Sequence, residues 1–267
     1  MEKKELLKNI DLYLFDMDGT LYLGKKLFPF TKELLDTIRA AGKRYMFMTN
    51  NSSSSVNDYV AKLDKLGIAA TKDDFITSTQ ATAHYLKENY PDCRPFVCGT
   101  KSFRKELYAE GFFVTNDTSQ ATCIVMGFDK ELTYKKLEDI CFMFNFKGDV
   151  PYVATNPDYV CPTEYGSIPD CGSICDMIYN ATGKRPYVIG KPNPLMVELA
   201  IAKCGVSKEK TAVVGDRIYT DIKSAINAGV NGFLVMSGET TPEILAESAD
   251  KPTLVLQDAS EIMNALK

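Results

Sequence analysis

Residues that build zinc sites or disulfide frameworks are few in this sequence. It contains one histidine, His84, and its eight cysteines include no C-x-x-C pair, so a structural zinc site is nearly excluded. Several cysteines lie inside apolar runs, as Cys123 does in the segment Cys-Ile-Val-Met. We therefore expect buried thiols in a reducing compartment and no disulfide framework.

Long apolar runs and blocks of one charge are also missing. No stretch approaches the roughly 18 consecutive apolar residues of a membrane span. Charged residues precede any apolar run at the N-terminus, so we expect no signal peptide and a cytoplasmic location. Lys and Arg number 31 against 35 Asp and Glu, for a formal net charge of -4, and no basic arm is present. This balance argues against nucleic acid or an anionic membrane as a partner.

The composition and periodicity that are present indicate an α/β protein. The chain has 267 residues, of which 45% are hydrophobic and 25% are charged, enough for one large domain or two modest ones. Short β-type runs alternate with helical patterns from end to end, which predicts mostly parallel strands. One set of runs could form a single open, doubly wound sheet: residues 11–17, 44–50, 187–190, 211–216, 232–236 and 253–256.

The middle third of the chain has an alternation of its own, which predicts a second, smaller domain. Its expected strands are residues 95–98, 112–115, 123–126 and 151–154, with helices near 101–110 and 133–146. We assign residues 80–186 to an inserted α/β domain. Residues 1–79 and 187–267 are assigned to the core domain that contains the open sheet.

Two carboxylates follow the first expected strand, in the run Asp-Met-Asp-Gly-Thr at 16–20. The carboxyl ends of strands in an open α/β sheet border the ligand crevice, so Asp16 and Asp18 should lie where ligands bind. Gly19 lets the chain turn so that a side chain and a main-chain carbonyl converge on one ion. A hard cation such as Mg²⁺ prefers oxygen ligands of this kind. Taken alone, the run fits an ordinary Asp-Gly turn equally well.

Three further polar motifs also lie at the ends of expected strands. Thr49 begins the run Thr-Asn-Asn-Ser, and Lys191 lies in Gly-Lys-Pro. Asp216 and Asp221 bracket the turn in Gly-Asp-Arg-Ile-Tyr-Thr-Asp. Singly, a capping loop, a solvated lysine and a helix N-cap are the commoner interpretations. Together, the four strand ends supply the nucleophile, acid/base, hydroxyl, cation and metal-binding acids of a phosphoryl-transfer site.

In these motifs the chain resembles the haloacid dehalogenase superfamily, whose pattern reads D-x-D-x-T, then Ser or Thr at a strand end, then Lys, then G-D-x-x-x-x-D. All four motifs match in order, over most of the chain outside its middle third. The long segment between Thr49 and Lys191 corresponds to the larger, α/β type of cap domain in that superfamily. The runs Ala-Thr-Asn-Pro-Asp at 154–158 and Val-Ile-Gly-Lys-Pro at 188–192 resemble the NagD and 4-nitrophenylphosphatase-like branch of phosphatases.

The resemblance implies an enzyme, a phosphatase that hydrolyses phosphate monoesters in two steps. Asp16 is then the nucleophile that becomes an aspartyl phosphate. Asp18 protonates the leaving oxygen and later deprotonates the attacking water. Lys191 neutralises negative charge on Asp16 and on the phosphoryl group.

The resemblance also implies Mg²⁺ as a cofactor. Its expected ligands are Asp16, Asp216 and the main-chain carbonyl of Asp18, with Asp221 in support. Electrostatics independently favours a cation here, since two carboxylates about 4 Å apart repel by about 4 kcal/mol at an effective dielectric of 20.

The expected ligand is a small phosphorylated metabolite, and both domains are expected to contact it. The hydroxyl of Thr49 and the amides of Asn50 and Asn51 are the expected partners of the phosphoryl oxygens. In the cap domain, the resemblance places Asn156 and Asp158 near the leaving group. The cap also offers a surface for self-association, so a homodimer is compatible with the sequence.

Other functions stay open at this point. A signalling receiver also uses a strand-end Asp, a Ser or Thr, a Lys and Mg²⁺, but as a phospho-acceptor that stores the phosphate; Asp18 and the large insertion argue against it. A non-catalytic protein that binds a phosphorylated metabolite is disfavoured by the complete set of acids with Lys191. Within the superfamily, dehalogenases tend to lack the second aspartate, and mutases usually carry a smaller helical cap before the second motif.

Overall fold

The computed structural model describes residues 2–24, 26–163 and 165–267. The chain forms two compact units: the first comprises Met1–Thr49, Val60–Ile76 and Lys191–Lys267, and the second comprises Asn50–Tyr59 and Thr77–Gly190. The borders predicted near residues 79 and 186 lie a few residues from those of the second unit. Residues 50–59, which the sequence analysis assigns to the core domain, group with the second unit instead.

The first unit is built on a six-stranded sheet. In spatial order its strands are β14 (Leu254–Leu256), β13 (Asn231–Val235), β12 (Thr211–Gly215), β1 (Leu12–Phe15), β4 (Arg44–Thr49) and β5 (Phe75–Thr77). β1 pairs in parallel with β4 and β12, and β13 pairs in parallel with β12 and β14. Every residue of β1 and β12 is buried, as is usual for parallel strands covered on both faces.

The direction in which strands are added to this sheet reverses at β1. The chain passes from β1 to β4 on one side and later adds β12, β13 and β14 on the other side. This is the doubly wound arrangement that the sequence predicts. Phe15 of β1 lies opposite Val214 of β12 and Phe47 of β4. The carboxyl ends of these three strands therefore open at a common edge, beside the point of reversal.

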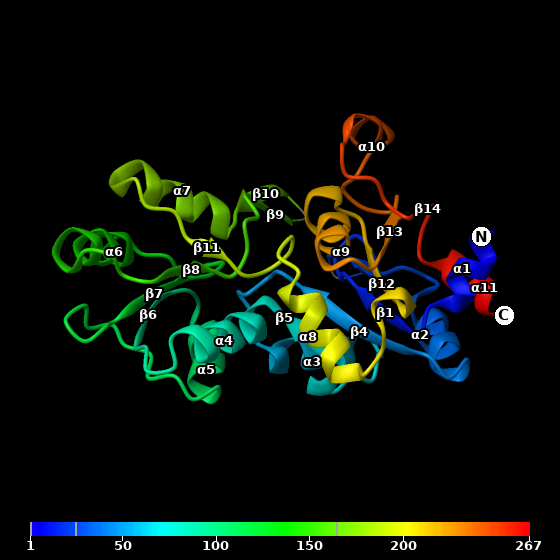
Figure 1. Cartoon of the computed structure of the whole chain (residues 1–267), viewed down its shortest axis with the longest axis horizontal. Coiled ribbons are helices and arrows are strands. Elements are labelled where there is room, and N and C mark those ends of the chain that lie inside the picture. Colours follow the sequence, from blue (N-terminus) through cyan, green and yellow to red (C-terminus); the bar gives the residue numbers. More distant parts are fainter. Residues whose placement is uncertain (1, 25, 164) are drawn as a thin grey trace. The chain divides into compact units, whose positions relative to one another are not determined.

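Two groups of helices pack in the first unit (Figure 1). α11 packs against α1 and α2, so the two ends of the chain lie together, while α8 packs against α9 and β1. Apolar residues at helical spacing direct this packing, as Leu34, Leu35 and Ile38 do on the buried side of α2. The helices are α1 (Lys3–Asn9), α2 (Thr31–Ala40), α8 (Leu195–Cys204), α9 (Lys223–Ala228), α10 (Pro242–Glu247) and α11 (Ser260–Leu266). The first turn of α3 (Val56–Lys65) belongs to the second unit and the remainder to the first.

Smaller elements complete the first unit. Two short 3₁₀ helices span Lys72–Asp74 and Lys208–Lys210, and a π-helical turn spans Ile218–Ile222. β2 (Tyr22–Leu23) and β3 (Lys26–Leu27) pair in antiparallel fashion shortly after β1.

The second unit has a four-stranded parallel sheet of its own, in the spatial order β11 (Tyr187–Val188), β8 (Tyr152–Ala154), β7 (Cys123–Met126) and β6 (Pro95–Cys98). Residues of this sheet and of two of the helices, α6 and α7, share one apolar core. An antiparallel hairpin of β9 (Val160–Thr163) and β10 (Gly166–Pro169) precedes α7. The helices are α4 (Ser78–Asn89), α5 (Lys101–Ala109), α6 (Tyr134–Lys147) and α7 (Cys171–Thr182).

Residues 50–59 join the second unit through hydrogen bonds to α5 and the residue before it. The amide of Ser55 donates to Ser102 Oγ at 3.2 Å, and the amide of Val56 donates to a Glu106 carboxylate oxygen at 3.0 Å. Thr100 Oγ1 donates to the carbonyl of Ser53 at 2.9 Å. These partners lie far away in the sequence, so local patterns do not reveal the grouping.

The expected strand at residues 112–115 is wrong. The segment makes one isolated bridge, between Thr115 and Phe96. Gly111 ends α5 with φ of 97°, and the amide of Phe112 bonds back to a carbonyl in the last turn of that helix, so Phe112 serves the helix end instead of a strand. The other expected strands are present with ends within two residues of those predicted.

The run at 187–190 is nevertheless assigned to the wrong sheet: β11 pairs with β8 of the second unit, and β5 is the sixth strand of the first sheet. The amides of Ile189 and Gly190 bond to the carbonyls of Ala154 and Thr155, which ties this run to the second unit.

The structure also bears on the expectations for the cysteines and for a membrane span. All eight cysteines are free thiols; Cys98, Cys123, Cys171 and Cys175 are buried as expected, and the other four are partly exposed. Among the described residues, no helix is both long enough and apolar enough to cross a membrane.

Phe103 is the side chain whose removal should weaken the second unit most clearly. It is fully buried, and its ring lies so close to Gly99 and Gly127 that a Cβ at either position would come within 2.3 and 2.8 Å of it. We expect Phe103→Ala to lower the free energy of unfolding by about 3–5 kcal/mol. Tyr108→Ala, in the same helix but 69% exposed, should change it by less than about 0.5 kcal/mol. Chemical denaturation measures both, and equal effects would contradict this packing.

Candidate active site at the carboxyl edge of the first sheet

Three carboxylates and one ammonium converge at the carboxyl edge of the first unit's sheet. Asp16 follows β1, and its amide donates to the carbonyl of Val214 on β12 at 2.8 Å. Asp216 follows β12, and Asp221 lies in the π-helical turn that comes next, an irregularity often found at functional sites. Lys191 begins the last segment of the unit. Four charged residues from three distant parts of the sequence thus lie together at the carboxyl edge of the first sheet.

Lys191 connects this group. Its side chain is only 2% exposed, and its Nζ donates to Asp16 Oδ1 at 2.6 Å, to Asp221 Oδ1 at 2.5 Å and to the carbonyl of Met48 at 3.3 Å. The second oxygen of Asp221 accepts a bond from the Arg217 amide at 3.1 Å. Both oxygens of Asp221 are therefore engaged, and this carboxylate holds the ammonium in position.

The electrostatic environment favours additional positive charge. Burial raises the pKa of Asp16 to about 8, against the lowering effect of Lys191, and the Asp221 and Asp216 carboxylates raise it further. Burial raises the pKa of Asp216 to about 6, with Asp221 adding to the effect. Burial lowers the pKa of Lys191, but the charges of Asp16 and Asp221 outweigh it, and the net pKa lies above its ordinary value. The carboxylates are thus short of cationic partners.

The donor set suits a divalent metal ion. Asp16, Asp216 and Asp221 each offer one oxygen, and these oxygens lie within 4.8 Å of one another. Asp216 Oδ1 is buried and has no hydrogen-bond partner among the described residues. A buried carboxylate oxygen without a donor is costly unless a cation binds it, and an all-oxygen set matches hard divalent ions.

A loop after β13 fixes the orientation of Asp216. The amide of Glu239 donates to Asp216 Oδ2 at 2.7 Å, and Thr240 Oγ1 donates to the Asp216 carbonyl at 2.5 Å. Gly238 gives the carboxylate room, because a Cβ there would lie 1.9 Å from Asp216 Oδ2. Sequence reasoning missed this loop. Its one signal is the run Ser-Gly-Glu-Thr-Thr at 237–241, directly after the expected strand at 232–236.

Asp18 lies apart from the acidic cluster. It is exposed, its Oδ1 accepts a long bond from the Gly24 amide at 3.4 Å, and its backbone forms a bridge with Tyr22. Gly19, next to it, turns the chain with φ of 82° and passes so close to Asp216 that a Cβ would lie 2.5 Å from its Oδ2. The turn therefore needs glycine for its backbone angle and for space.

The Thr-Asn-Asn run spans the border between the two units. Thr49 ends β4 in the first unit, and Asn50 begins the second; both are buried. Asn51 Oδ1 accepts bonds from the amide and the hydroxyl of Ser53, at 3.0 and 2.7 Å, and its carbonyl accepts one from the Tyr59 hydroxyl. The side chain of Asn51 is therefore used to shape the turn.

Asn156 and Asp158 form a buried network within the second unit. They are 1% and 3% exposed. Asp158 Oδ2 accepts bonds from the amide groups of both Asn50 and Asn156, each at 3.0 Å. Asn156 also donates to Asp170 at 3.3 Å, and Asp170 caps α7. Asp158 therefore contacts Asn50, and Asn156 links Asp158 to the residue that caps α7.

Gly238 gives a test of the Asp216 environment. We expect Gly238→Ala to displace the Asp216 carboxylate and to weaken binding of a divalent cation about 10- to 100-fold, the range usual for outer contacts of metal sites. Calorimetric titration of Mn²⁺ measures this. Gly232→Ala, within β13, is the control for loss of a glycine and should bind Mn²⁺ as the parent does. Unchanged affinity in Gly238→Ala would show that the cation binds elsewhere.

Comparisons with known proteins agree with this geometry. Residues 13–113 match the family model described as haloacid dehalogenase-like hydrolase, and residues 188–262 match that of HAD-like hydrolases. The 5'-nucleotidase YutF of Bacillus subtilis is 32% identical over 96% of this chain and 98% of its own. The acid sugar phosphatase of Staphylococcus aureus is 31% identical over 98% of this chain and 100% of its own.

A solved structure extends the likeness to the whole fold. The 4-nitrophenylphosphatase of Thermotoga maritima is 42% identical and superposes with a TM-score of 0.93, covering 98% of this chain and 99% of that one. Identity and coverage at this level, with the strand-end acids and lysine in place, establish the relationship. The chain belongs to the haloacid dehalogenase-like hydrolases, in the NagD and 4-nitrophenylphosphatase branch, and is a phosphoric monoester hydrolase.

Proposed function

We propose that this enzyme hydrolyses small-molecule phosphate monoesters with the help of Mg²⁺, through an aspartyl phosphate on Asp16. The observation that supports the proposal best is the buried ammonium of Lys191, 2.6 Å from Asp16 and in contact with Asp221, beside the unpaired Asp216 Oδ1. A carboxylate that already has a cationic partner can approach a phosphate at less electrostatic cost. Lys191 would also neutralise charge on the phosphoryl group.

In the first proposed step, a carboxylate oxygen of Asp16 attacks phosphorus. An oxygen–phosphorus bond forms to Asp16, the bond to the leaving oxygen breaks, and Asp18 gives that oxygen a proton. In the second step, Asp18 takes a proton from water, the water oxygen bonds to phosphorus, and the bond to Asp16 breaks. The exposure of the Asp18 side chain supports its role as the group that exchanges protons.

Mg²⁺ is the proposed metal, held by Asp16, Asp216 and the main-chain carbonyl of Asp18, with Asp221 in support. When bound, it would supply positive charge to the phosphoryl oxygens and orient them. The raised pKa values of Asp16 and Asp216 support this assignment, because each carboxylate gains from a nearby cation.

The proposed phosphoryl-binding groups are the Thr49 hydroxyl and the amides of Asn50 and Asn51. Their position at the end of β4, the strand next to β1, supports the assignment. We propose that the second unit selects the substrate as a cap domain. Asp158 acts on the site through its bond from the Asn50 side chain, and Asn156 supports it by donating to the same Asp158 oxygen. Relatives named for a nucleotide, a sugar phosphate and 4-nitrophenyl phosphate support a small phosphate monoester.

Asp16→Asn tests the nucleophile. The parent enzyme should release phosphate from 4-nitrophenyl phosphate with Mg²⁺ and lose activity in EDTA. Asp16→Asn should lower turnover by on the order of 10³-fold or more, because the amide cannot form the covalent intermediate, while substrate binding is largely retained. Asp149→Asn is the matched control: its side chain is 96% exposed and lies in the second unit.

Two different results would contradict this mechanism. Parental rates in Asp16→Asn would remove the covalent mechanism. No phosphate release by the parent, together with a stable acyl phosphate after incubation with acetyl phosphate, would favour a phospho-acceptor.

Asp158→Ala tests the network that reaches Asn50. Replacing the carboxylate by a methyl group removes the acceptor shared by Asn50 and Asn156. We expect kcat/KM to fall by on the order of 100-fold, the effect of a small misplacement of a binding group. Asp170→Asn is the control, because Asn also caps helices and keeps an oxygen that can accept from Asn156. Equal losses in both variants, or a matching loss of thermal stability, would indicate a purely structural role.

A further inference from the structure

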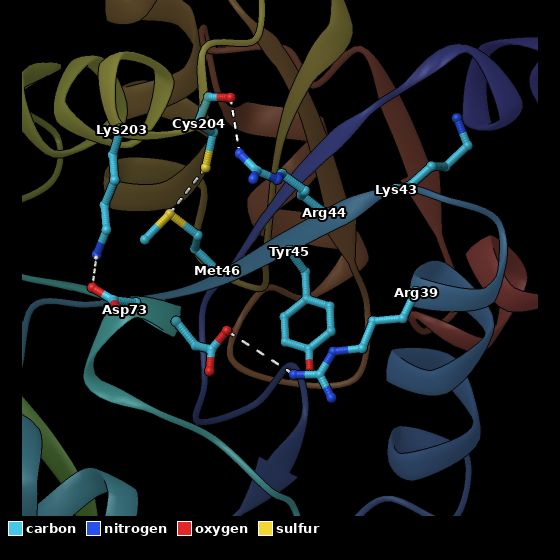
Figure 2. A pocket seen from close by; sticks show the side chains of 9 residues that line it. Arg39, Lys43, Arg44, Tyr45, Met46, Asp73, Lys203 and Cys204 are labelled. Carbon is cyan, nitrogen blue, oxygen red and sulfur yellow. Dashed lines mark hydrogen bonds and ion pairs between the residues drawn. The ribbon is translucent and has the colours of Figure 1, made fainter.

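A cavity of about 270 Å³ lies in the first unit, away from the candidate active site. It opens at the amino end of β4, whereas Thr49 of the active-site motif ends the same strand. At roughly 30 Å³ per water molecule, the space holds about nine waters, which is more than a bare phosphate or sulfate ion fills. Its lining is shown in Figure 2 and consists of Arg39, Lys43, Arg44, Tyr45, Met46, Asp73, Asp74, Lys203 and Cys204.

Basic side chains outnumber acidic ones in this lining by four to two. Lys203 pairs with Asp73 at 3.3 Å, and Arg39 lies 4.0 Å from Asp74. Asp74 is also held by Thr71, whose amide and hydroxyl donate to its other oxygen. The Arg39–Asp74 pair is therefore long, and Asp74 is shared with Thr71. The Lys203–Asp73 pair is also longer than a close ion pair.

The two acids of the lining pair with Lys203 and Arg39, so the positive charge of Arg44 is not balanced by a carboxylate of the lining. Its Nη1 donates to the carbonyl of Cys204 at 3.0 Å, and no carboxylate among the described residues lies within ion-pair distance of it. Lys43, by contrast, points away (Figure 2) and is paired with Asp11 at 3.1 Å. Since a guanidinium has five N–H donors, Arg44 can bind an anion while it keeps its bond to the helix end.

Part of the lining is apolar or weakly polar. Met46 is 2% exposed, and its sulfur lies 3.6 Å from the Cys204 thiol. The Arg39 guanidinium covers the ring of Tyr45, 4.8 Å from its centre. The Tyr45 side chain is 6% exposed, and its hydroxyl has no hydrogen-bond partner among the described residues. Burial raises the pKa of Tyr45 to about 12, so this hydroxyl remains a donor.

We propose that this cavity binds a small organic anion, separately from the catalytic reaction. Its phosphate or carboxylate group pairs with Arg44 and Lys203, and its carbon part contacts Met46 and Cys204. Asp73 competes with the ligand for Lys203, so the acid weakens binding. Removing the charge of Asp73 should therefore strengthen binding of the anion, and removing the charge of Arg44 or Lys203 should weaken it.

Two methionines of β4 allow binding at the two ends of the strand to be separated. Met46 lines the cavity, and the main-chain carbonyl of Met48 accepts a bond from Lys191. We would follow the side-chain methyl resonances of both by NMR in the full-length protein, assigned with Met46→Leu and Met48→Leu. The titrants are phenylphosphonate and benzoate, in EDTA, so that phosphoryl and carboxylate ligands are compared directly.

The expected result is a saturable shift of the Met46 methyl resonance with at least one of the two anions. Arg44→Gln and, as a second variant in case the first is unstable, Lys203→Gln should each weaken that binding about tenfold, the usual effect of losing a charged hydrogen bond. Asp73→Asn should strengthen it several-fold. Lys208→Gln removes an exposed charge outside the cavity and should change nothing.

Two results would overturn the proposal. One is a Met46 resonance that does not move, or that moves only together with Met48 and is insensitive to Arg44→Gln and Lys203→Gln. The other is an equal loss in Lys203→Gln and Lys208→Gln, which would indicate attraction to net charge alone.

Discussion

The ion pairs of the buried Lys191 ammonium are the interaction on which the rest of the site depends. This group joins Asp16, after the first strand, to Asp221, in the turn after β12, and also bonds to the end of β4. Removing one partner from such a buried set leaves a charge without compensation, which usually costs about 3–5 kcal/mol. The site and the central strands of the first sheet are therefore stabilised together.

The charges around Lys191 do not balance by themselves. Three carboxylates gather near one ammonium, and burial, with this excess adding to it, raises the pKa values of Asp16 and Asp216. A divalent cation would correct the excess before a phosphate dianion enters. Glycines at positions 19 and 238 leave room for the Asp216 carboxylate, and the Glu239 amide holds one of its oxygens. The same electrostatic need would let one strand edge hold the proposed metal, nucleophile and phosphoryl group at once.

Much of the fold and the cluster could be predicted because the relevant signals are local. Apolar runs that end in Asp or Thr mark the carboxyl edge of a parallel sheet, and this places Asp16 and Asp216 together. Long-range partners have no such signal. The grouping of Asn50 with the second unit depends on Asp158, about a hundred residues away, and the support that Gly238 gives Asp216 depends on one close contact. The expected strand at 112–115 failed because a helix end uses Phe112 first.

The stereochemical course at phosphorus tests the covalent account most directly. A phosphorothioate monoester made chiral with oxygen isotopes would be hydrolysed in isotopically labelled water, and the configuration of the product read by phosphorus NMR. Attack by Asp16 followed by attack of water comprises two in-line displacements, so the account predicts overall retention. Inversion would mean that water attacks phosphorus directly, and it would contradict a phosphorylated Asp16.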